Sequence, residues 1–298
     1  MEKFYEGIKR IKSSEFNVLE VEERDLIREI IKLQRKHKAD MLITDSYNVN
    51  EQYFNITKKY FSRTVYVDDI NKHYLNVDLI INQNIGAEDL IYDVPKNSKL
   101  LLGIKYLMLR EEFRVVSYRN INKRILNIMI TIGASDFNGI TNIICKYVKE
   151  LEYEFHIVVG PAFKNENICE LMELSEKYKN IKLYFNVDMV KLMSLCDLAI
   201  SACGSTLYEL AVCGVPTIGV IVAENQEQVS MNLQNCGVII NLGWYNKLNK
   251  EFYCRCIKYL DKNIKKRIKM NYNAHKLIDG NGVARITEIL NNTKDRRR

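Results

Sequence analysis

The residues best suited to chemistry follow an apolar run at positions 198–200. Gly204, Ser205 and Thr206 come after it, and apolar residues then recur at helical spacing. This pattern predicts a strand, a glycine turn and a helix. A helix that begins directly after a strand presents unpaired backbone N–H groups and the positive end of its dipole. Phosphate is the natural ligand of such a turn, so the stretch predicts an anion-binding site.

Glu209 lies three residues after Thr206, one turn into the predicted helix. Two interpretations fit this spacing. In a capping box, Thr206 bonds forward and Glu209 bonds back to the start of the helix. In the second interpretation, the carboxylate accepts hydrogen bonds from ribose or sugar hydroxyls. Replacement by Gln separates the two, because a cap tolerates it with modest loss and a ribose ligand does not.

A second small-residue turn follows the apolar run at 126–132. It reads Gly133, Ala134, Ser135 and Asp136, which alone is a weak motif. Together with the turn at 204–206, at the end of a neighbouring strand, it predicts a cradle for a diphosphate.

Polar side chains also follow strands in the first half of the chain. Asp45 and Tyr47 come directly after the apolar run at 41–44, where Asp45 could act as a base or orienting group and Tyr47 as a hydrogen-bond donor. The alternatives are a helix N-cap for Asp45 and packing for Tyr47. Asp68 and Asp69 are expected to form a turn rather than a metal site, and no metal or cofactor is expected.

Seven short segments carry a resemblance to known proteins. They are 43–47, 102–106, 109–113, 132–136, 204–210, 214–217 and 224–226. The last three resemble the nucleotide-binding half of the MurG-like, GT-B-type proteins. The other four are similar to segments of the PseG hydrolases, also known as SpsG-type spore coat polysaccharide proteins. The resemblance covers about residues 39–226, most of the chain.

The resemblance implies a GT-B architecture, with two doubly wound α/β domains facing a cleft. It also implies a UDP-sugar hydrolase of pseudaminic-type acid or surface polysaccharide biosynthesis, in which water attacks the anomeric carbon and releases UDP and a diacetamido-trideoxyhexose. The residues that would bind the substrate are Gly133, Ala134, Ser135, Asp136, Gly204, Ser205 and Thr206 at the phosphates, Glu209 at the ribose, Asn225 and Gln226 at the donor sugar, and Arg110 near the leaving diphosphate.

Strands alternating with helices predict parallel sheets covered on both faces. Residues 1–118 are expected to form an incomplete N-terminal domain, and residues 119–298 a nucleotide-sugar-binding domain with a helical tail. The polar stretch from Ser117 to Arg124 is the predicted linker.

The sequence departs from the family at its N-terminus. PseG-like proteins open with a Gly-His segment whose histidine is assigned as the base, and residues 1–12 already correspond to a later position. None of the histidines lies in such a loop, so His37, His73, His156 and His275 are expected to be structural or exposed. The first domain is therefore expected to be truncated. A GT-B glycosyltransferase and a non-catalytic nucleotide-sugar binder, or a subunit whose partner chain supplies the missing segment, are the alternative functions.

Composition argues against a nucleic-acid-binding protein and against a membrane-spanning one. The chain has 298 residues, 47% of them hydrophobic, and a net charge of +7. Basic residues in the run 262–269 and the tail 296–298 are expected to form a solvated helix face and a frayed end, not a nucleic-acid site. No apolar run of ~18 residues is present, which excludes a membrane-spanning helix. Eight cysteines without a CxxC pair are expected to be reduced and mostly buried, in a cytosolic protein.

Overall fold

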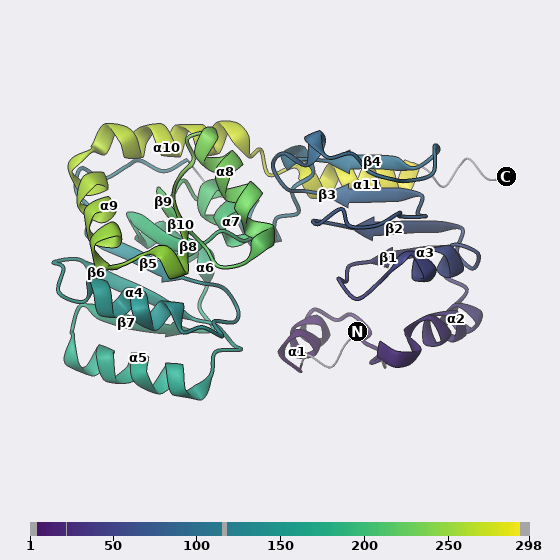
Figure 1. Ribbon diagram of the computed structural model, residues 1–298, viewed down its shortest axis with the longest axis horizontal. Coiled ribbons are helices and arrows are strands. Elements are labelled where there is room, and N and C mark those ends of the chain that lie inside the picture. The colour runs from purple at the N-terminus through teal and green to yellow at the C-terminus, as the bar shows by residue number, and fades with distance from the viewer. Residues whose placement is uncertain (1–4, 22, 115–117, 293–298) are drawn as a thin grey trace. The chain divides into compact units, whose positions relative to one another are not determined.

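The computed structural model describes residues 5–21, 23–114 and 118–292, which form two compact units (Figure 1). The first unit comprises the described residues up to Gln83 and the segment Ala87–Leu102. The second comprises Asn84–Gly86 and the described residues from Gly103 onward. Each unit contains a parallel sheet with helices, as the alternating sequence pattern predicts.

The compact units divide near residue 102, whereas the sequence predicts a boundary at 118. The segment after Gly103 packs with the C-terminal helix: a Cβ on Gly282 would lie 2.2 Å from the carbonyl oxygen of Leu107. In addition, Arg285 Nη1 donates to the carbonyl oxygen of Lys105 at 2.9 Å. Ser117, the start of the predicted linker, lies outside the described residues. The functional limits of the domains stay a prediction.

The sheet of the first unit has four parallel strands in sequential order. They are β1 (Met41–Thr44), β2 (Arg63–Val67), β3 (Leu79–Asn82) and β4 (Lys99–Leu102). Thr44 pairs with Tyr66, and Val67 pairs with Ile81, so the first three strands end close to one another. The polar residues that follow these strands therefore share one edge of the sheet.

Short helices accompany this sheet. They are α1 (Tyr5–Ser13), η1 (Glu23–Asp25), α2 (Leu26–His37), α3 (Glu51–Thr57) and η2 (Ala87–Asp89). Helix α3 begins at Asn50, whose side chain accepts a hydrogen bond from the N–H of Tyr53 at 3.0 Å. Tyr53 and Phe54 of α3 pack with Tyr66 and Ile80 in a buried core.

The second unit has a six-stranded parallel sheet in the order β10-β9-β8-β5-β6-β7. The strands are β5 (Asn127–Thr131), β6 (Glu154–Val159), β7 (Ile181–Phe185), β8 (Leu198–Ala202), β9 (Thr217–Ile221) and β10 (Ile239–Trp244). The chain adds β6 and β7 on one side of β5, and then β8, β9 and β10 on the other. The direction of winding therefore reverses between β5 and β8.

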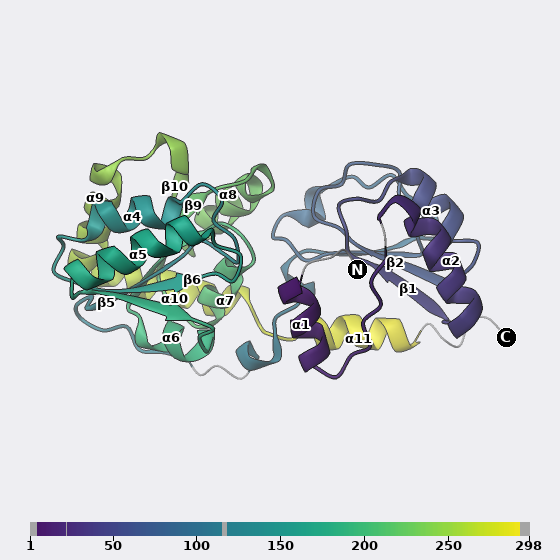
Figure 2. The same cartoon turned by 90° about the horizontal axis from the view of Figure 1, so that it is seen from below.

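Helices cover both faces of this sheet (Figure 2). The helices of the second unit are η3 (Ile104–Tyr106), η4 (Glu111–Phe113), α4 (Ile140–Val148), α5 (Asn165–Lys177), α6 (Met189–Leu195), α7 (Thr206–Val212), η5 (Glu224–Gln226), α8 (Glu227–Asn235), η6 (Tyr245–Lys247), α9 (Lys250–Lys262), α10 (Ile264–Leu277) and α11 (Gly282–Asn292). Side chains of α4, α5 and α9 join one core, and those of α6, α7 and α8 join the other. The β8–α7–β9 unit is thus held from both sides.

The structure tests two expectations from the sequence, one about membrane-spanning helices and one about the basic run 262–269. In the parts of the chain that are described, no helix has the length and apolar character needed to cross a membrane. The basic run 262–269 is only partly a solvated face, because Arg267 is completely buried. Its Nη1 and Nη2 donate to the carbonyl oxygens of Asn122 and Lys123 at 2.8 and 2.9 Å. Arg267 therefore connects α10 to the segment before β5 by hydrogen bonds.

Candidate functional site

The two predicted anion-binding turns follow adjacent strands of the second unit. Strands β5 and β8 are paired in parallel, with Thr131 opposite Ser201, so the turns at 133–136 and 204–206 leave the same edge of the sheet. The winding direction reverses between these strands. In open α/β sheets, ligands bind outside the carboxyl ends of the strands at this switch point. The sheet order thus brings the two turns together.

The first turn is shaped by close backbone packing. Gly133 has a φ of +116°, in a region that other residues rarely adopt. A Cβ on Gly160, after β6, would lie 2.5 Å from the carbonyl oxygen of Gly133 and 2.4 Å from that of Ala134. Ala162 N–H also donates to the Ala134 carbonyl at 2.9 Å. The turn therefore packs on the backbone at 160–162.

Asp136 closes this turn by bonding to the helix behind it. Its two carboxylate oxygens accept from the N–H groups of Ile140 and Thr141 at 2.8 and 2.7 Å. The residue is only 3% exposed. Since the carboxylate already occupies the start of α4, the backbone at Gly133–Ser135 is the part of this turn left to meet a ligand. Ligand binding by these residues stays a prediction.

The second turn is less crowded. Ser205 is the N-cap of α7, and its side chain makes no capping hydrogen bond. Around Gly204, a Cβ would have a single atom within 4 Å, Nε2 of Gln226 at 3.7 Å. The Gln226 side chain is held by its Oε1, which accepts from Val222 N–H at 3.1 Å. The structure therefore brings Gln226, one of the predicted sugar-binding residues, beside the glycine turn.

Glu209 does not form the capping box that was one of its two interpretations. Its carboxylate accepts from Nε of Arg110 at 3.0 Å. Arg110 also contacts Glu112 at 2.8 Å from Nη1, and its guanidinium lies 4.8 Å from the centre of the Phe113 ring. Two residues predicted to bind the substrate therefore meet at the first turn of α7, where the carboxylate is held in place by a cation.

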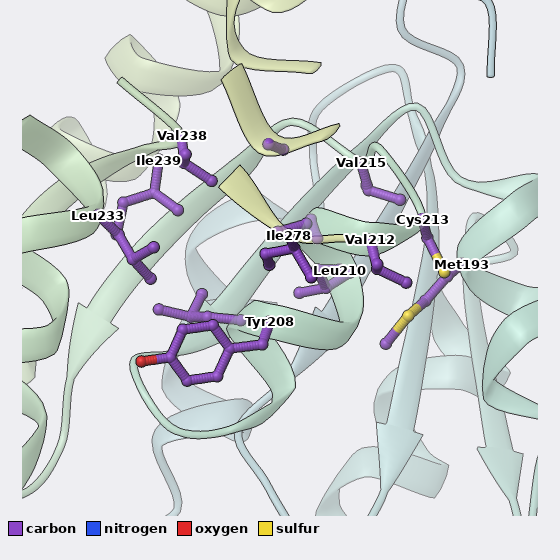
Figure 3. Close-up of a cluster of buried hydrophobic side chains, with 14 of the residues drawn as sticks. Met193, Tyr208, Leu210, Val212, Cys213, Val215, Leu233, Val238, Ile239 and Ile278 are labelled. Atoms are coloured by element: carbon purple, nitrogen blue, oxygen red, sulfur yellow. The ribbon is translucent and has the colours of Figure 1, made fainter. Parts of the chain in front are cut away.

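Tyr208 is a further residue of α7 that the sequence reasoning did not single out. Its ring lies in the buried apolar cluster that also contains Leu210 and Ile278 (Figure 3). Its hydroxyl accepts from Ile85 N–H at 3.2 Å and donates to Oδ1 of Asn84 at 3.3 Å. Asn232 Nδ2 donates to the Ile85 carbonyl at 2.9 Å. The segment 84–86 is thus attached to α7 and α8, a contact with no local sequence signal.

The predicted catalytic pair belongs to the first unit. Asp45 follows β1 and is not a helix cap, because Asn50 caps α3. Tyr47 is 63% exposed rather than packed, and its hydroxyl donates to Oδ2 of Asp69 at 2.6 Å. Partial burial, and secondly the charge of Asp69, raise the pKa of the Asp45 carboxyl. The ends of β1 and β2 therefore bring the acidic Asp69 near Asp45, a candidate base whose pKa is raised.

Asp68 forms a turn, as predicted. It is buried and accepts from the N–H groups of Ile70 and Asn71 at 3.3 and 3.0 Å. The Tyr92 hydroxyl donates to the same carboxylate at 2.7 Å and accepts from Asn82 Nδ2 at 2.8 Å. No group of metal-ligating side chains is present among the residues that the structure describes.

Two histidines and Cys203 have packing roles. His156 is 2% exposed and lies between Tyr184 and Asn127, with both ring nitrogens at 2.9 Å from an oxygen of these residues. His275 stacks on Tyr118 with ring centres 4.6 Å apart. Cys203 is buried, which raises the pKa of its thiol to about 12. A thiol with this pKa is a poor nucleophile.

Curated relatives include proteins that act on sugar nucleotides. An uncharacterized protein of Methanocaldococcus jannaschii is 29% identical over 226 residues, covering 71% of this chain and 46% of that protein. The Helicobacter pylori pseudaminic acid cytidylyltransferase and UDP-2,4-diacetamido-2,4,6-trideoxy-beta-L-altropyranose hydrolase is 27% identical, covering 67% and 37%. The match thus spans less than half the length of these two relatives. The Campylobacter jejuni UDP-2,4-diacetamido-2,4,6-trideoxy-beta-L-altropyranose hydrolase is 24% identical, covering 71% and 77%.

The fold also resembles those of solved protein structures. The crystal structure of Acinetobacter baumannii MurG matches with a TM-score of 0.67 at 12% identity, covering 98% of this chain and 89% of that one. This likeness confirms the predicted GT-B-like fold with two parallel α/β sheets, and the relatives confirm the resemblance to the PseG hydrolases. The family model described as the glycosyltransferase family 28 C-terminal domain matches residues 127–284, more than half of the 298 residues. The chain therefore belongs to the family of the glycosyltransferase family 28 C-terminal domain.

Proposed function

We propose that this protein hydrolyses a UDP-sugar. The pairing of β5 with β8 supports the proposal. These strands lie at the switch point of the second sheet, and their pairing places two glycine turns at the same edge. Backbone N–H groups at such turns suit the oxygens of a diphosphate. Relatives whose names include a UDP-sugar hydrolase favour the same substrate class.

In the proposed complex, the diphosphate binds at Gly133–Ser135 and Gly204–Thr206. Glu209 accepts hydrogen bonds from the ribose hydroxyls, and Asn225 and Gln226 contact the donor sugar. Arg110 is held between two carboxylates, so it can turn toward the diphosphate only by loosening one of these contacts. Its charge would then stabilise the leaving group.

Hydrolysis requires a water molecule to be deprotonated as it attacks. Its oxygen forms a bond to the anomeric carbon, and the bond from this carbon to the β-phosphate oxygen breaks, which releases UDP and the free sugar. We propose Asp45 as the group that takes the proton, because its raised pKa makes the carboxylate a stronger base than an ordinary Asp. Tyr47 would orient the substrate from the same strand end. The diacetamido-trideoxyhexose, the role in nonulosonic acid or surface polysaccharide biosynthesis and a cytosolic location belong to this proposal.

A glycosyltransferase is the second candidate function. The description of the matching family and the MurG-like fold favour it. In this reaction an acceptor hydroxyl takes the place of water, while the nucleotide site is unchanged. The two functions therefore share every proposed contact to UDP and differ only in the nucleophile.

Two measurements test the proposal. Calorimetry with UDP should show binding by the full chain, and Gly204→Ala should weaken it. Incubation with UDP-2,4-diacetamido-2,4,6-trideoxy-β-L-altropyranose alone should then release UDP and free sugar. Release of UDP only when an acceptor is added would support the transferase, and binding without any release would support a non-catalytic binder. If no heat is seen with UDP, the proposal is wrong.

A further inference from the structure

The first unit contains a large groove lined by none of the predicted site residues. Its volume is about 830 Å³, and it lies between α2 and residues around α3. The apolar lining includes Ile27, Ile31 and Ile56 and the rings of Tyr53 and Tyr60. No residue of α2 is buried, although the helix carries an apolar stripe. Within the described residues, the groove is therefore an apolar surface without a cover.

A row of cations borders this groove on α2 and just before it. Arg24 of η1 and Arg28, Lys32 and Arg35 of α2 all line it and are all exposed. The spacing of four and three residues places the three cations of α2 along one side of the helix. At 1.5 Å per residue these three span about 10 Å. Asp25 is the one acidic side chain in the described lining, so the groove is strongly cationic.

These cations are not neutralised within the described part of the chain. No ion pair of Arg24, Arg28 or Arg35 occurs there, and Lys32 only approaches Glu29 at 3.9 Å. By contrast, Lys146 of α4 and Arg255 of α9 each form an ion pair with a glutamate. The row on α2 therefore has room for the acidic groups of another molecule.

The groove is held in shape by contacts within the first unit. The Gln34 side chain joins the end of α2 to the segment after α3: its Nε2 donates to the carbonyl oxygens of Ala39 and Tyr60 at 2.9 Å each. Its Oε1 accepts from Ala39 N–H at 2.9 Å. Ile27 also packs against the core of the first unit. A preformed groove lowers the ordering cost of binding.

We propose that this groove binds an acidic amphipathic helix of a partner polypeptide. The apolar stripe of such a helix would cover the apolar lining, and carboxylates spaced four and three residues apart would meet the cations of α2. Two turns of helix span about 11 Å, which is close to the length of that row. A concave surface suits a protruding helix better than a flat bilayer, and a row of cations suits a chain of acidic groups better than a single small anion.

The test uses two synthetic helical peptides with identical leucine stripes and a fluorescent label. One carries Glu at the three positions that face the cations of α2, and the other carries Lys there. Fluorescence anisotropy with the full chain should show binding of the Glu peptide only, tighter at low salt. Arg28→Glu with Lys32→Glu should weaken this binding about ten-fold or more.

A matched control makes the same change of charge elsewhere. Lys258→Glu with Lys262→Glu, on exposed positions of α9, should leave peptide binding unaltered. Thermal unfolding of each variant checks that it is folded. The proposal is overturned if both peptides bind equally, if the control pair weakens binding as much, or if neither peptide binds. If neither peptide binds but the protein binds vesicles of anionic phospholipid, the occupant of the groove is a membrane surface. UDP binding has no part in any of these outcomes.

Discussion

Arg110 and Glu209, 99 residues apart in the sequence, form an ion pair at 3.0 Å at the start of α7. The Glu209 side chain is 15% exposed and the Arg110 side chain 44%. Arg110 is shared with Glu112, so neither carboxylate has the cation to itself. A ligand that binds the turn at 204–206 would therefore compete for a group that is already engaged.

We expect Glu209→Gln to weaken UDP binding about ten-fold or more. Hydrogen bonds to a charged group contribute about 1.5–3 kcal/mol, and 1.4 kcal/mol is a factor of ten in affinity. The unfolding free energy should change by less than about 1 kcal/mol, because a partly exposed ion pair contributes little to stability. Calorimetry and thermal unfolding measure the two effects separately. Glu112→Gln, which also removes a partner of Arg110, is the control and should leave UDP affinity within about two-fold of the original. Equal losses in both variants would contradict the ribose role of Glu209.

Gly204→Ala and Gly160→Ala are expected to act on UDP binding for different reasons. At Gly204 the added methyl meets only Gln226 at 3.7 Å, so the protein should keep its stability and lose affinity only through contact with the ligand. At Gly160 the methyl would lie within 2.5 Å of two carbonyl oxygens of the first turn. That variant should lose both stability and UDP binding. Thermal unfolding and calorimetry on the pair test this, and a Gly204→Ala variant with full affinity would show that no ligand approaches this backbone.

The parts of the site that are local in sequence could be predicted. Apolar runs that end in glycine turns identify β5 and β8 and the residues after them, and the alternation of strands and helices gives the parallel sheets. The ion pair of Arg110 with Glu209 could not be predicted, because it depends on how the segment before β5 folds back onto α7. The sequence offered a capping box or a ribose ligand for Glu209, and tertiary structure supplied a third partner.

We expect the pH dependence of turnover to depend on Asp69 if Asp45 is the base. Burial and the charge of Asp69 raise the pKa of Asp45. A base acts in its ionised form, so activity should rise as pH rises through this pKa. Asp69→Asn removes one cause of the increase, so the acid limb of the rate profile should move to lower pH.

The control for that shift is Asp40→Asn, which removes the same charge just before β1, at the opposite end of the strand. Its rate profile should keep the original acid limb. If Asp69→Asn changes only the maximal rate and not the position of the limb, then Asp69 does not act through the ionisation of Asp45. Initial rates of UDP release measured over a range of pH distinguish these results.

We expect Tyr208→Phe to destabilise the second unit by about 1–3 kcal/mol. The hydroxyl accepts a hydrogen bond from the buried N–H of Ile85, and an unsatisfied buried donor costs this amount. The ring itself should stay in the apolar cluster, so the loss reports on the hydroxyl alone. Chemical denaturation measures it. Tyr272→Phe, on an exposed position of α10, should change stability by less than about 0.5 kcal/mol. Equal stability of Tyr208→Phe and the original protein would mean that another group or water replaces the hydroxyl.

Charge runs were the least informative part of the sequence, and Arg267 shows why. It stands among lysines of α10 that are exposed or half-exposed, yet it is completely buried and its burial lowers the pKa of the guanidinium. Composition cannot separate it from its neighbours, because only tertiary structure brings the carbonyl groups of Asn122 and Lys123 to it. Helical periodicity gives some signal, since Arg267 lies three residues before the buried Met270.

Arg267→Lys is expected to cost nearly as much stability as Arg267→Met, about 3 kcal/mol or more. The guanidinium donates from three nitrogens, including Nε to the carbonyl oxygen of Leu260 at 2.9 Å, and a single ammonium cannot reach all three acceptors. Each acceptor left unpaired in the interior costs about 1–3 kcal/mol. Lys265→Met, on the exposed side of the same helix, should change the free energy of unfolding by less than about 0.5 kcal/mol. Denaturant titration of the three variants measures these differences. If Arg267→Lys proved as stable as the original chain, positive charge rather than the three-way contact would be what holds α10 to the segment before β5.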